Sequence, residues 1–249
     1  MKAIRAELHV HTVLSPCGDI EMIPPLIVAE AIDRGINLIA ITDHNASANI
    51  EPVQKAAKGM DLVVLPGMEL QTAEEVHVLC LFDRLEQIEA LQKVVDSSLP
   101  NLENNPDFFG EQFIVDETGD FIRREHRLLL VSASMTLSET WKIVNELGGL
   151  LIPAHVDRKA FGLLSSLGFV PTDIPIDILE ISMQLPPDQA VKKFPQISGY
   201  QLIQSGDVHY LADFLGANEM LIEAPTISEI RKAIKNLEGR SHRIITRRS

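Results

Sequence analysis

Two histidines in this sequence stand one residue apart at the end of an apolar segment. They are His9 and His11, in the stretch LHVHT. Side chains alternate between the two faces of an extended strand, so these imidazoles point the same way, with Cα atoms roughly 6.5 Å apart. Hydrophobic burial does not explain such a pair, whereas a neutral imidazole is a common metal ligand. The spacing therefore aims two potential ligands at one place.

Residues of the same chemical kinds recur where other apolar segments end or begin. They are His44 in ITDHN, Glu69 in PGMEL, His77 in EVHVL, His155 in PAHVD, and Asp207 with His209 in SGDVH. A single histidine usually has a structural role, because imidazole forms hydrogen bonds in many settings. Six of the eight histidines belong to this set, however, and two pairs share the one-residue spacing. In apolar surroundings an unpaired charge is costly, so the repetition favours a cluster over a scatter.

Imidazole and carboxylate ligands without thiolate suit zinc, manganese or iron. A catalytic zinc commonly takes three protein ligands and keeps one position open. The number of candidate ligands exceeds the needs of one ion. The sequence therefore predicts a cofactor of two or three divalent metal ions.

Helical patterns alternate with the apolar segments and must position these residues. One example is PPLIVAEAIDRG, with prolines at its start and Gly35 at its end; another is LSETWKIVNELGG, with a predicted N-cap at Ser138. Continuously apolar strands separated by helices predict a mostly parallel sheet that is covered on both faces. Seven or eight such units favour a closed α/β barrel. A doubly wound sheet normally has a glycine-rich turn after its first strand, where this chain has HVHTVLS.

Length and composition predict a single domain over residues 1–249, because a chain that is 45% hydrophobic can bury one large core. Residues 101–138 interrupt the alternation and predict an insertion with a small hairpin or helix, serving as a lid or an oligomer contact. The formal charge of −13 argues against broad binding to long duplex nucleic acid or to anionic membranes. With neither a signal peptide nor a membrane-length apolar run, we expect a cytoplasmic protein. Cys17 and Cys80 lack CxxC spacing and are predicted to be free thiols.

The motifs LHVHT, ITDHN, PGMEL, PAHVDR and SGDVH resemble, in this order and along most of the chain, those of the PHP (polymerase and histidinol phosphatase) family. The resemblance implies a distorted (β/α)7 barrel with a metal cluster that hydrolyses phosphoesters. It implies these ligands: His9, His11, Glu69 and Asp207 for a first ion; Glu69, His77 and His155 for a second; and Asp19, His44 and His209 for a third. One departure concerns TVLSPCGD, where SPCG intervenes before Asp19. The extra residues could reposition Asp19 or make Cys17 a neighbour of the site.

The predicted function is a metal-dependent phosphoesterase for a small phosphorylated metabolite or nucleotide. By the resemblance, the substrate is a nucleotide 3′,5′-bisphosphate, the 5′ end of a short oligonucleotide, or histidinol phosphate. The nucleophile would be a hydroxide that bridges two metal ions, with Glu69 and His77 among the catalytic residues. The negative charge favours short substrates over long duplexes. Two other functions stay open: a noncatalytic metal-stabilised scaffold module, and an amidohydrolase-like lactone or amide hydrolase.

Residues near the predicted ligands have candidate supporting roles. Arg158, three residues after His155, is predicted to clamp the substrate phosphate by two parallel hydrogen bonds. Asp43 and Asp157 are candidates for orienting the ligand imidazoles. The charged runs RREHR and RIITRRS are predicted to be a solvated face or tail, as are the histidines His126 and His242 beside or within them.

Overall fold

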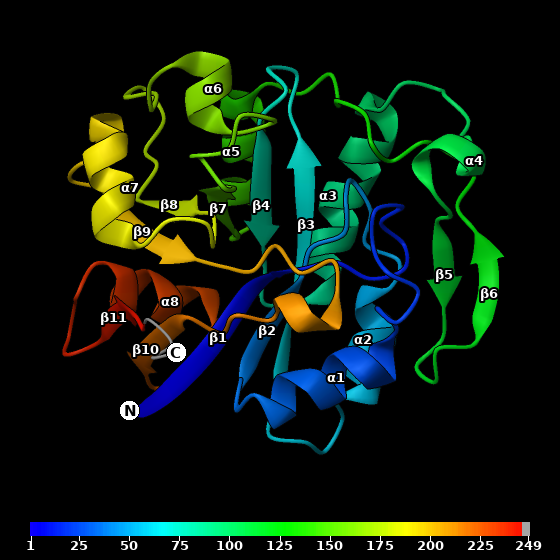
Figure 1. The fold of residues 1–249 in the computed structure, drawn as a ribbon, viewed down its shortest axis with the longest axis horizontal. Helices are drawn as coiled ribbons and strands as arrows, with labels where there is room; N and C mark the ends of the chain where they lie inside the picture. Colours follow the sequence, from blue (N-terminus) through cyan, green and yellow to red (C-terminus); the bar gives the residue numbers. More distant parts are fainter. Residues whose placement is uncertain (246–249) are drawn as a thin grey trace.

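The computed structural model describes residues 1–245 and has a curled seven-stranded sheet at its centre (Figure 1). The strand order is β11-β10-β1-β2-β3-β4-β7. The strands are β1 (Lys2–Val10), β2 (Leu38–Ile41), β3 (Val63–Gln71), β4 (His77–Leu81), β7 (Leu150–Pro153), β10 (Asn218–Ile222) and β11 (Ser241–Ile244). Strands β1, β2 and β3 are parallel to one another, whereas β10 runs antiparallel to β1.

A second, parallel pair of strands completes the wall of the barrel. It consists of β8 (Ile178–Ile181) and β9 (Gln201–Gln204). The Val156 amide, after β7, donates to the carbonyl of Glu180 in β8. Beyond β9, Val208 forms a parallel bridge with Val10 at the end of β1. Strands β1, β2, β3, β4, β7, β8 and β9 therefore follow one another around a distorted barrel, which confirms the predicted fold class.

Strand β4 is a departure from the mostly parallel sheet that we predicted. It runs antiparallel to both of its neighbours, β3 and β7. The connection from β3 spans only residues 72–76 and is closed by a hydrogen bond from the Thr72 amide to the Val76 carbonyl. A parallel crossover needs a dozen or more residues, so this short turn forces the chain to reverse. As a result, His77 at the amino end of β4 lies at the same rim as the carboxyl ends of its neighbours.

Helices cover the barrel, and buried apolar residues fill its interior. The helices are α1 (Pro24–Asp33), α2 (Ile50–Ala56), α3 (Leu85–Ser98), α5 (Leu137–Glu146), α6 (Leu163–Leu167), α7 (Pro187–Lys193) and α8 (Ile227–Ile234), with short 3₁₀ turns η1 (Pro195–Ile197) and η2 (Leu211–Asp213). One buried cluster joins Leu8, Leu79 and Ile178 of the strands to the apolar face of α8. The start of α5 differs from the prediction at Ser138. Thr136 is the N-cap, because its side chain and that of Glu139 form a reciprocal capping box.

The segment predicted as an insertion contains both a helix and a hairpin. Helix α4 (Pro106–Phe109) precedes β5 (Phe113–Val115) and β6 (Phe121–Arg124), which pair with each other and lie beside the barrel, at the right of Figure 1. The Phe113 amide donates to the Val13 carbonyl, so the hairpin is joined to the loop that follows β1. Within residues 1–245, no helix has the length and hydrophobicity needed to cross a membrane.

Candidate metal centre

Four buried ligand-type side chains converge at the carboxyl rim of the barrel. His9 comes from β1, His11 directly follows that strand, Glu69 comes from β3, and Asp207 from the segment after β9. His9 Nε2 lies 3.3 Å from Glu69 Oε1 and 3.1 Å from Asp207 Oδ1. His11 Nε2 lies 3.3 Å from Glu69 Oε2 and 3.2 Å from Asp207 Oδ1. One ligand atom of each residue falls within 4.8 Å of the others.

The hydrogen bonding of this inner cluster is incomplete in a way that suits a cation. His9 Nε2, His11 Nε2, Glu69 Oε2 and Asp207 Oδ1 are buried and have no hydrogen-bond partner. Such atoms are rare in folded proteins. Ligand atoms held at about 2.0–2.2 Å around a tetrahedral zinc are roughly 3.3 Å apart, close to the 3.1–3.3 Å separations here. The donor set and its spacing therefore fit a divalent metal ion.

Glu69 is at the centre of a second group of imidazoles. Its Oε1 lies 2.8 Å from His77 Nδ1 and 3.0 Å from His155 Nε2, and its Oε2 lies 2.9 Å from His44 Nδ1. Together with His9 and His11, these residues bring five imidazoles into contact with the Glu69 carboxylate. A carboxylate in this position can bridge two cations.

The outer part of the site contains His209 but not the carboxylate of Asp19. Ligand nitrogens of His11, His44 and His209 lie within 4.8 Å of one another. The Asp19 side chain instead accepts a hydrogen bond of 2.9 Å from the Glu21 amide. The sulfur of Cys17 lies 3.1 Å from His209 Nε2. Eight of the nine predicted ligands thus come together, and Asp19 is the residue that the structure leaves outside the cluster.

Burial keeps the outer imidazoles neutral. It lowers the pKa of His44 to about 4 and that of His209 to about 3. Both rings are therefore deprotonated near neutral pH and able to bind a cation. Burial also raises the pKa of the Cys17 thiol to about 12, helped by the charges of Glu69 and Asp207.

The inner carboxylates are ionised despite their burial. Burial alone would raise the pKa of Glu69, but the facing His77, His9 and His44 hold it well below its usual range. For the His11 imidazole, burial has the opposite effect and lowers the pKa. Its contacts with Asp207 and Glu69 outweigh burial and raise the pKa of His11 to about 9. Positive charge is thus drawn to the place where the unpartnered ligand atoms meet.

Two polar residues that were not predicted from the sequence orient the imidazoles of His9 and His11. Glu180 accepts a 2.9 Å hydrogen bond from His9 Nδ1 and a 3.1 Å bond from the His155 amide. Ser15 Oγ accepts from His11 Nδ1 at 2.9 Å and donates to Asp43 at 2.7 Å. Both networks turn the Nε2 atoms toward the cluster. The available signal for Glu180 was a single acid within the otherwise apolar run ILEI.

The two aspartates predicted to orient imidazoles have different partners. Asp43 acts on His11 only through Ser15 and also accepts from Thr12. Asp157 accepts from the amide and hydroxyl of Ser182, which joins the loop after β7 to the end of β8. Only Asp43 is therefore connected to a ligand by its carboxylate.

A cavity of about 460 Å³ opens above the cluster. The Arg158 guanidinium is partly exposed in it and forms an ion pair with Asp207. Phe109 and Leu130, from the predicted insertion, also line the cavity. The insertion therefore contributes to the mouth of the site.

Phe161 lies beside His77 in an unusual conformation. Its ring stacks on the imidazole with centroids 4.5 Å apart and planes 2° apart, and its carbonyl accepts from the His77 amide at 3.0 Å. Its φ of 58° is rare for a bulky residue, and such strain is concentrated at functional sites. Phe161 is 41% exposed and lines the cavity, so part of its surface is open to a ligand.

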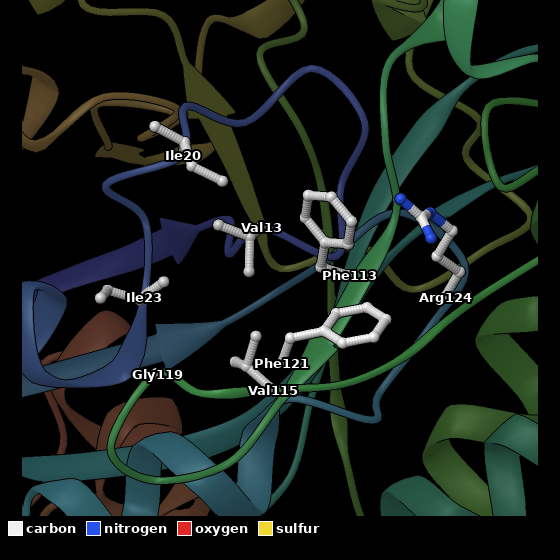
Figure 2. Close-up of a pocket in the computed structure, with 8 residues that line it drawn as sticks. All are labelled: Val13, Ile20, Ile23, Phe113, Val115, Gly119, Phe121 and Arg124. Atoms are coloured by element: carbon white, nitrogen blue, oxygen red, sulfur yellow. The ribbon is translucent and has the colours of Figure 1, made fainter.

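A second pocket lies where the loop after β1 meets the β5–β6 hairpin (Figure 2). Val13, Ile20 and Ile23 of the loop line it together with Phe113 and Phe121 of the hairpin, around a cavity of about 260 Å³. Arg124 also lines this pocket, and its guanidinium pairs with Glu111. The pocket is mainly apolar and contains none of the predicted metal ligands.

The predicted solvated histidines differ from each other. His126 is exposed, as expected. The prediction for His242 is wrong: it is half-buried in β11, with Nε2 3.2 Å from Asn218 Oδ1. Of the basic run near the carboxyl end, residues 246–249 lie outside the described part of the chain.

Comparisons with known proteins identify relatives that share parts of this chain. A stretch of 77 residues, 30% of the chain, is 34% identical to the 5′-3′ exoribonuclease Rnm of Escherichia coli (strain K12) and covers 25% of that protein. The lesion-specific endonuclease PfuEndoQ of Pyrococcus furiosus has the same fold over 97% of this chain and 58% of its own, with a TM-score of 0.72 and 21% identity. A structure of Endonuclease Q with a 27-mer duplex that carries an abasic lesion aligns with a TM-score of 0.67 at 21% identity, over 96% of this chain and 58% of that one.

The chain thus spans only part of the length of these relatives. The family model of the PHP domain matches residues 7–147, more than half of the chain, and this range includes both histidines of LHVHT, His44, Glu69 and His77. The matched segment carries the first half of the converging cluster, and the remaining ligand-type residues reach the same rim from β7 and β9. The chain belongs to the PHP domain family.

Proposed function

We propose that the protein is a metal-dependent phosphoesterase that acts on a nucleotide 3′,5′-bisphosphate or on the 5′ end of a short oligonucleotide. The observation that carries this proposal is the convergence of buried, unpartnered imidazole and carboxylate atoms beneath a cavity that also contains an arginine. Divalent cations bound there would lower the pKa of water to near neutral and offset the charge of a phosphate.

The residues of the chain hold and orient the reacting groups. Glu69 bridges the inner and outer imidazoles, while Glu180 and Ser15 fix the rings of His9 and His11. Arg158 is placed to donate to a phosphate at the mouth of the cavity. Its present partner, Asp207, is also a predicted ligand, so a cation that engages this carboxylate would free the guanidinium for substrate.

A nucleotide is favoured over histidinol phosphate by two observations. The exposed face of Phe161 offers a surface on which a base can stack next to the cluster. The relative from Escherichia coli is named as an exoribonuclease. The formal charge of −13 favours a short substrate, although the duplex bound by Endonuclease Q means that the fold alone does not exclude longer DNA.

The proposal is tested by incubating the metal-free protein with Mn²⁺, Zn²⁺ or Fe²⁺ and a substrate panel. The panel contains nucleotide 3′,5′-bisphosphates, 5′-phosphorylated RNA and DNA of two to five nucleotides, a 27-mer duplex, histidinol phosphate and a lactone. We expect release of phosphate or mononucleotide, and no release after chelation. Full metal binding without turnover of any compound would support the scaffold function instead, and turnover of the lactone alone would support the amidohydrolase-like function.

A further inference from the structure

Cys17 lies next to His209, one of the residues that the family resemblance groups with Asp19 around a third ion. Its sulfur lies 3.1 Å from His209 Nε2. His209 Nδ1 is 2.8 Å from the carbonyl of Asp207, an acceptor, so this nitrogen carries the ring proton and Nε2 has a free lone pair. Sulfur and nitrogen ligands of one tetrahedral zinc are roughly 3.5 Å apart, which is close to the observed separation.

A buried ligand atom without a partner points independently to a cation in this part of the site. His11 is fully buried, its Nδ1 is used by Ser15, and its Nε2 has no hydrogen-bond partner. His11 also belongs to the group with His44 and His209, and its ring stacks on that of His209 with centroids 4.1 Å apart. The three imidazoles thus surround a position that Cys17 approaches from the cavity side.

The conformation of the loop explains why the thiol, and not the carboxylate, faces this position. The Gly18 amide donates to the Ser15 carbonyl at 2.8 Å, and the Asp19 amide donates to the His209 carbonyl at 2.8 Å. A Cβ on Gly18 would lie 2.7 Å from the Thr12 carbonyl oxygen, so this tight turn requires glycine. The Asp19 side chain then caps the Glu21 amide, pointing to a different partner.

The loop between β1 and α1 also packs against the segment predicted as an insertion. On the side away from the metal centre, Val13, Ile20 and Ile23 pack toward the hairpin residues of the apolar pocket (Figure 2). Gly110 lies so close to Pro16 that an added Cβ would be 2.1 Å from the Pro16 carbonyl oxygen. The backbone position of Cys17 is therefore fixed by the turn at Gly18 and by the close contact between Pro16 and Gly110.

We propose that Cys17, in place of Asp19, is the outermost ligand of the metal centre and binds a zinc ion together with His44 and His209. Binding breaks the S–H bond, forms a bond between sulfur and the cation, and releases one proton to solvent. Thiolates select soft or borderline ions, so this position favours zinc over manganese. The inference deepens the proposed function, because it rests on the presence of a metal centre.

The test uses cobalt as a spectroscopic substitute for zinc in the full chain. Metal-free wild-type protein, Cys17→Ser, Asp19→Asn and Cys80→Ala are loaded with Co²⁺, and metal content and absorption are measured. We expect an intense sulfur-to-cobalt charge-transfer band in the near ultraviolet for the wild type. Asp19→Asn and Cys80→Ala should keep it, and Cys17→Ser should lose it together with one equivalent of metal. Cys80 is the matched control, because it is the other cysteine of the chain and is buried in β4.

A second readout is the reactivity of the thiol. Cys17 is exposed to solvent, so a disulfide reagent can reach it in metal-free Cys80→Ala protein, where the raised pKa of the thiol sets a slow reference rate. Loading with Zn²⁺ should slow the labelling of Cys17 at least tenfold. The double variant Cys80→Ala/Asp19→Asn should show the same decrease in labelling rate, because Asp19 is not a ligand in this proposal.

The outcomes separate the two proposals. Stoichiometric cobalt with no charge-transfer band, or full cobalt content in Cys17→Ser together with the loss of one equivalent in Asp19→Asn, would overturn the role of Cys17 and leave the metal centre standing. A wild-type protein that binds no cobalt would overturn both proposals.

Discussion

The metal centre and the apolar pocket of Figure 2 lie on two sides of the same loop and differ in what holds them together. In the metal centre, charged and polar groups are buried, and several ligand atoms have no partner within the protein. In the apolar pocket, Phe113 and Phe121 meet edge to face, and the one charged group, Arg124, is paired with Glu111. The ligand atoms of the metal centre need a cation as partner, whereas the charged group of the apolar pocket already has a partner within the protein. Substitutions should therefore affect metal binding and turnover in one region and only stability in the other.

The largest effect is expected for Glu69→Gln. The change keeps the shape of the side chain but removes the charge that five imidazoles share, so no inner or bridging cation would be held. We expect loss of most bound metal and a fall in turnover of roughly 10³-fold or more. Metal analysis and steady-state kinetics measure this. Glu117→Gln, at an exposed position of the hairpin turn, is the control and should behave as wild type.

A smaller effect is expected for Glu180→Gln. This residue touches no predicted cation position but fixes the His9 ring through a 2.9 Å hydrogen bond. Loss of such an orienting partner typically lowers metal affinity or activity by about 10–100-fold. Titration with Mn²⁺ gives the affinity. Asp157→Asn is the matched control, because its buried contacts are with Ser182 and not with an imidazole. Equal losses in both variants would show that Glu180 supports the fold and not the metal centre.

The sequence predicted the ligand residues whose positions follow from the alternation of side chains along a strand. The one-residue spacing of His9 and His11 predicts their common face for any β-strand. His77 was also predicted to join the set, although the reversal of β4 depends on the length of the turn before it. Glu180 was missed because one acid in an apolar strand carries no information about what it faces.

The loop between β1 and α1 could not be predicted in the same way. Which of Cys17 and Asp19 faces the cluster depends on turns that involve Ser15 and Gly18, and on an insertion that is distant in sequence. No periodicity encodes these contacts. Family resemblance assigns a position along the chain, whereas local hydrogen bonding decides the direction of the side chain.

An intermediate effect, limited to nucleotide substrates, is expected for Phe161→Ala. Stacking of a base on an aromatic side chain is worth about 1–3 kcal/mol, so KM for a nucleotide should rise by roughly tenfold. KM for p-nitrophenyl phosphate, which lacks a base, should be less affected. Phe169→Ala removes another exposed ring and is the control. An equal rise in KM for both substrates would show that Phe161 acts only by packing against His77.

The smallest effect is expected for Phe121→Ala in the apolar pocket. Phe121 is 56% exposed; its ring forms an edge-to-face pair with Phe113, whose centroid is 5.6 Å away, and lies 5.7 Å from the Arg124 guanidinium. An aromatic pair contributes about 0.5–1.5 kcal/mol, which corresponds to a fall in Tm of roughly 1–6 °C in a chain of this size. Turnover and metal content should not change, because the residues that fix Cys17 on the other side of the loop form their own hydrogen bonds. Phe169→Ala, at a position 58% exposed and without such an aromatic pair among the described residues, should leave Tm unchanged. If Phe121→Ala instead released metal from the outer position, the packing of the hairpin would be part of the metal centre, and the two regions would have to be treated as one site.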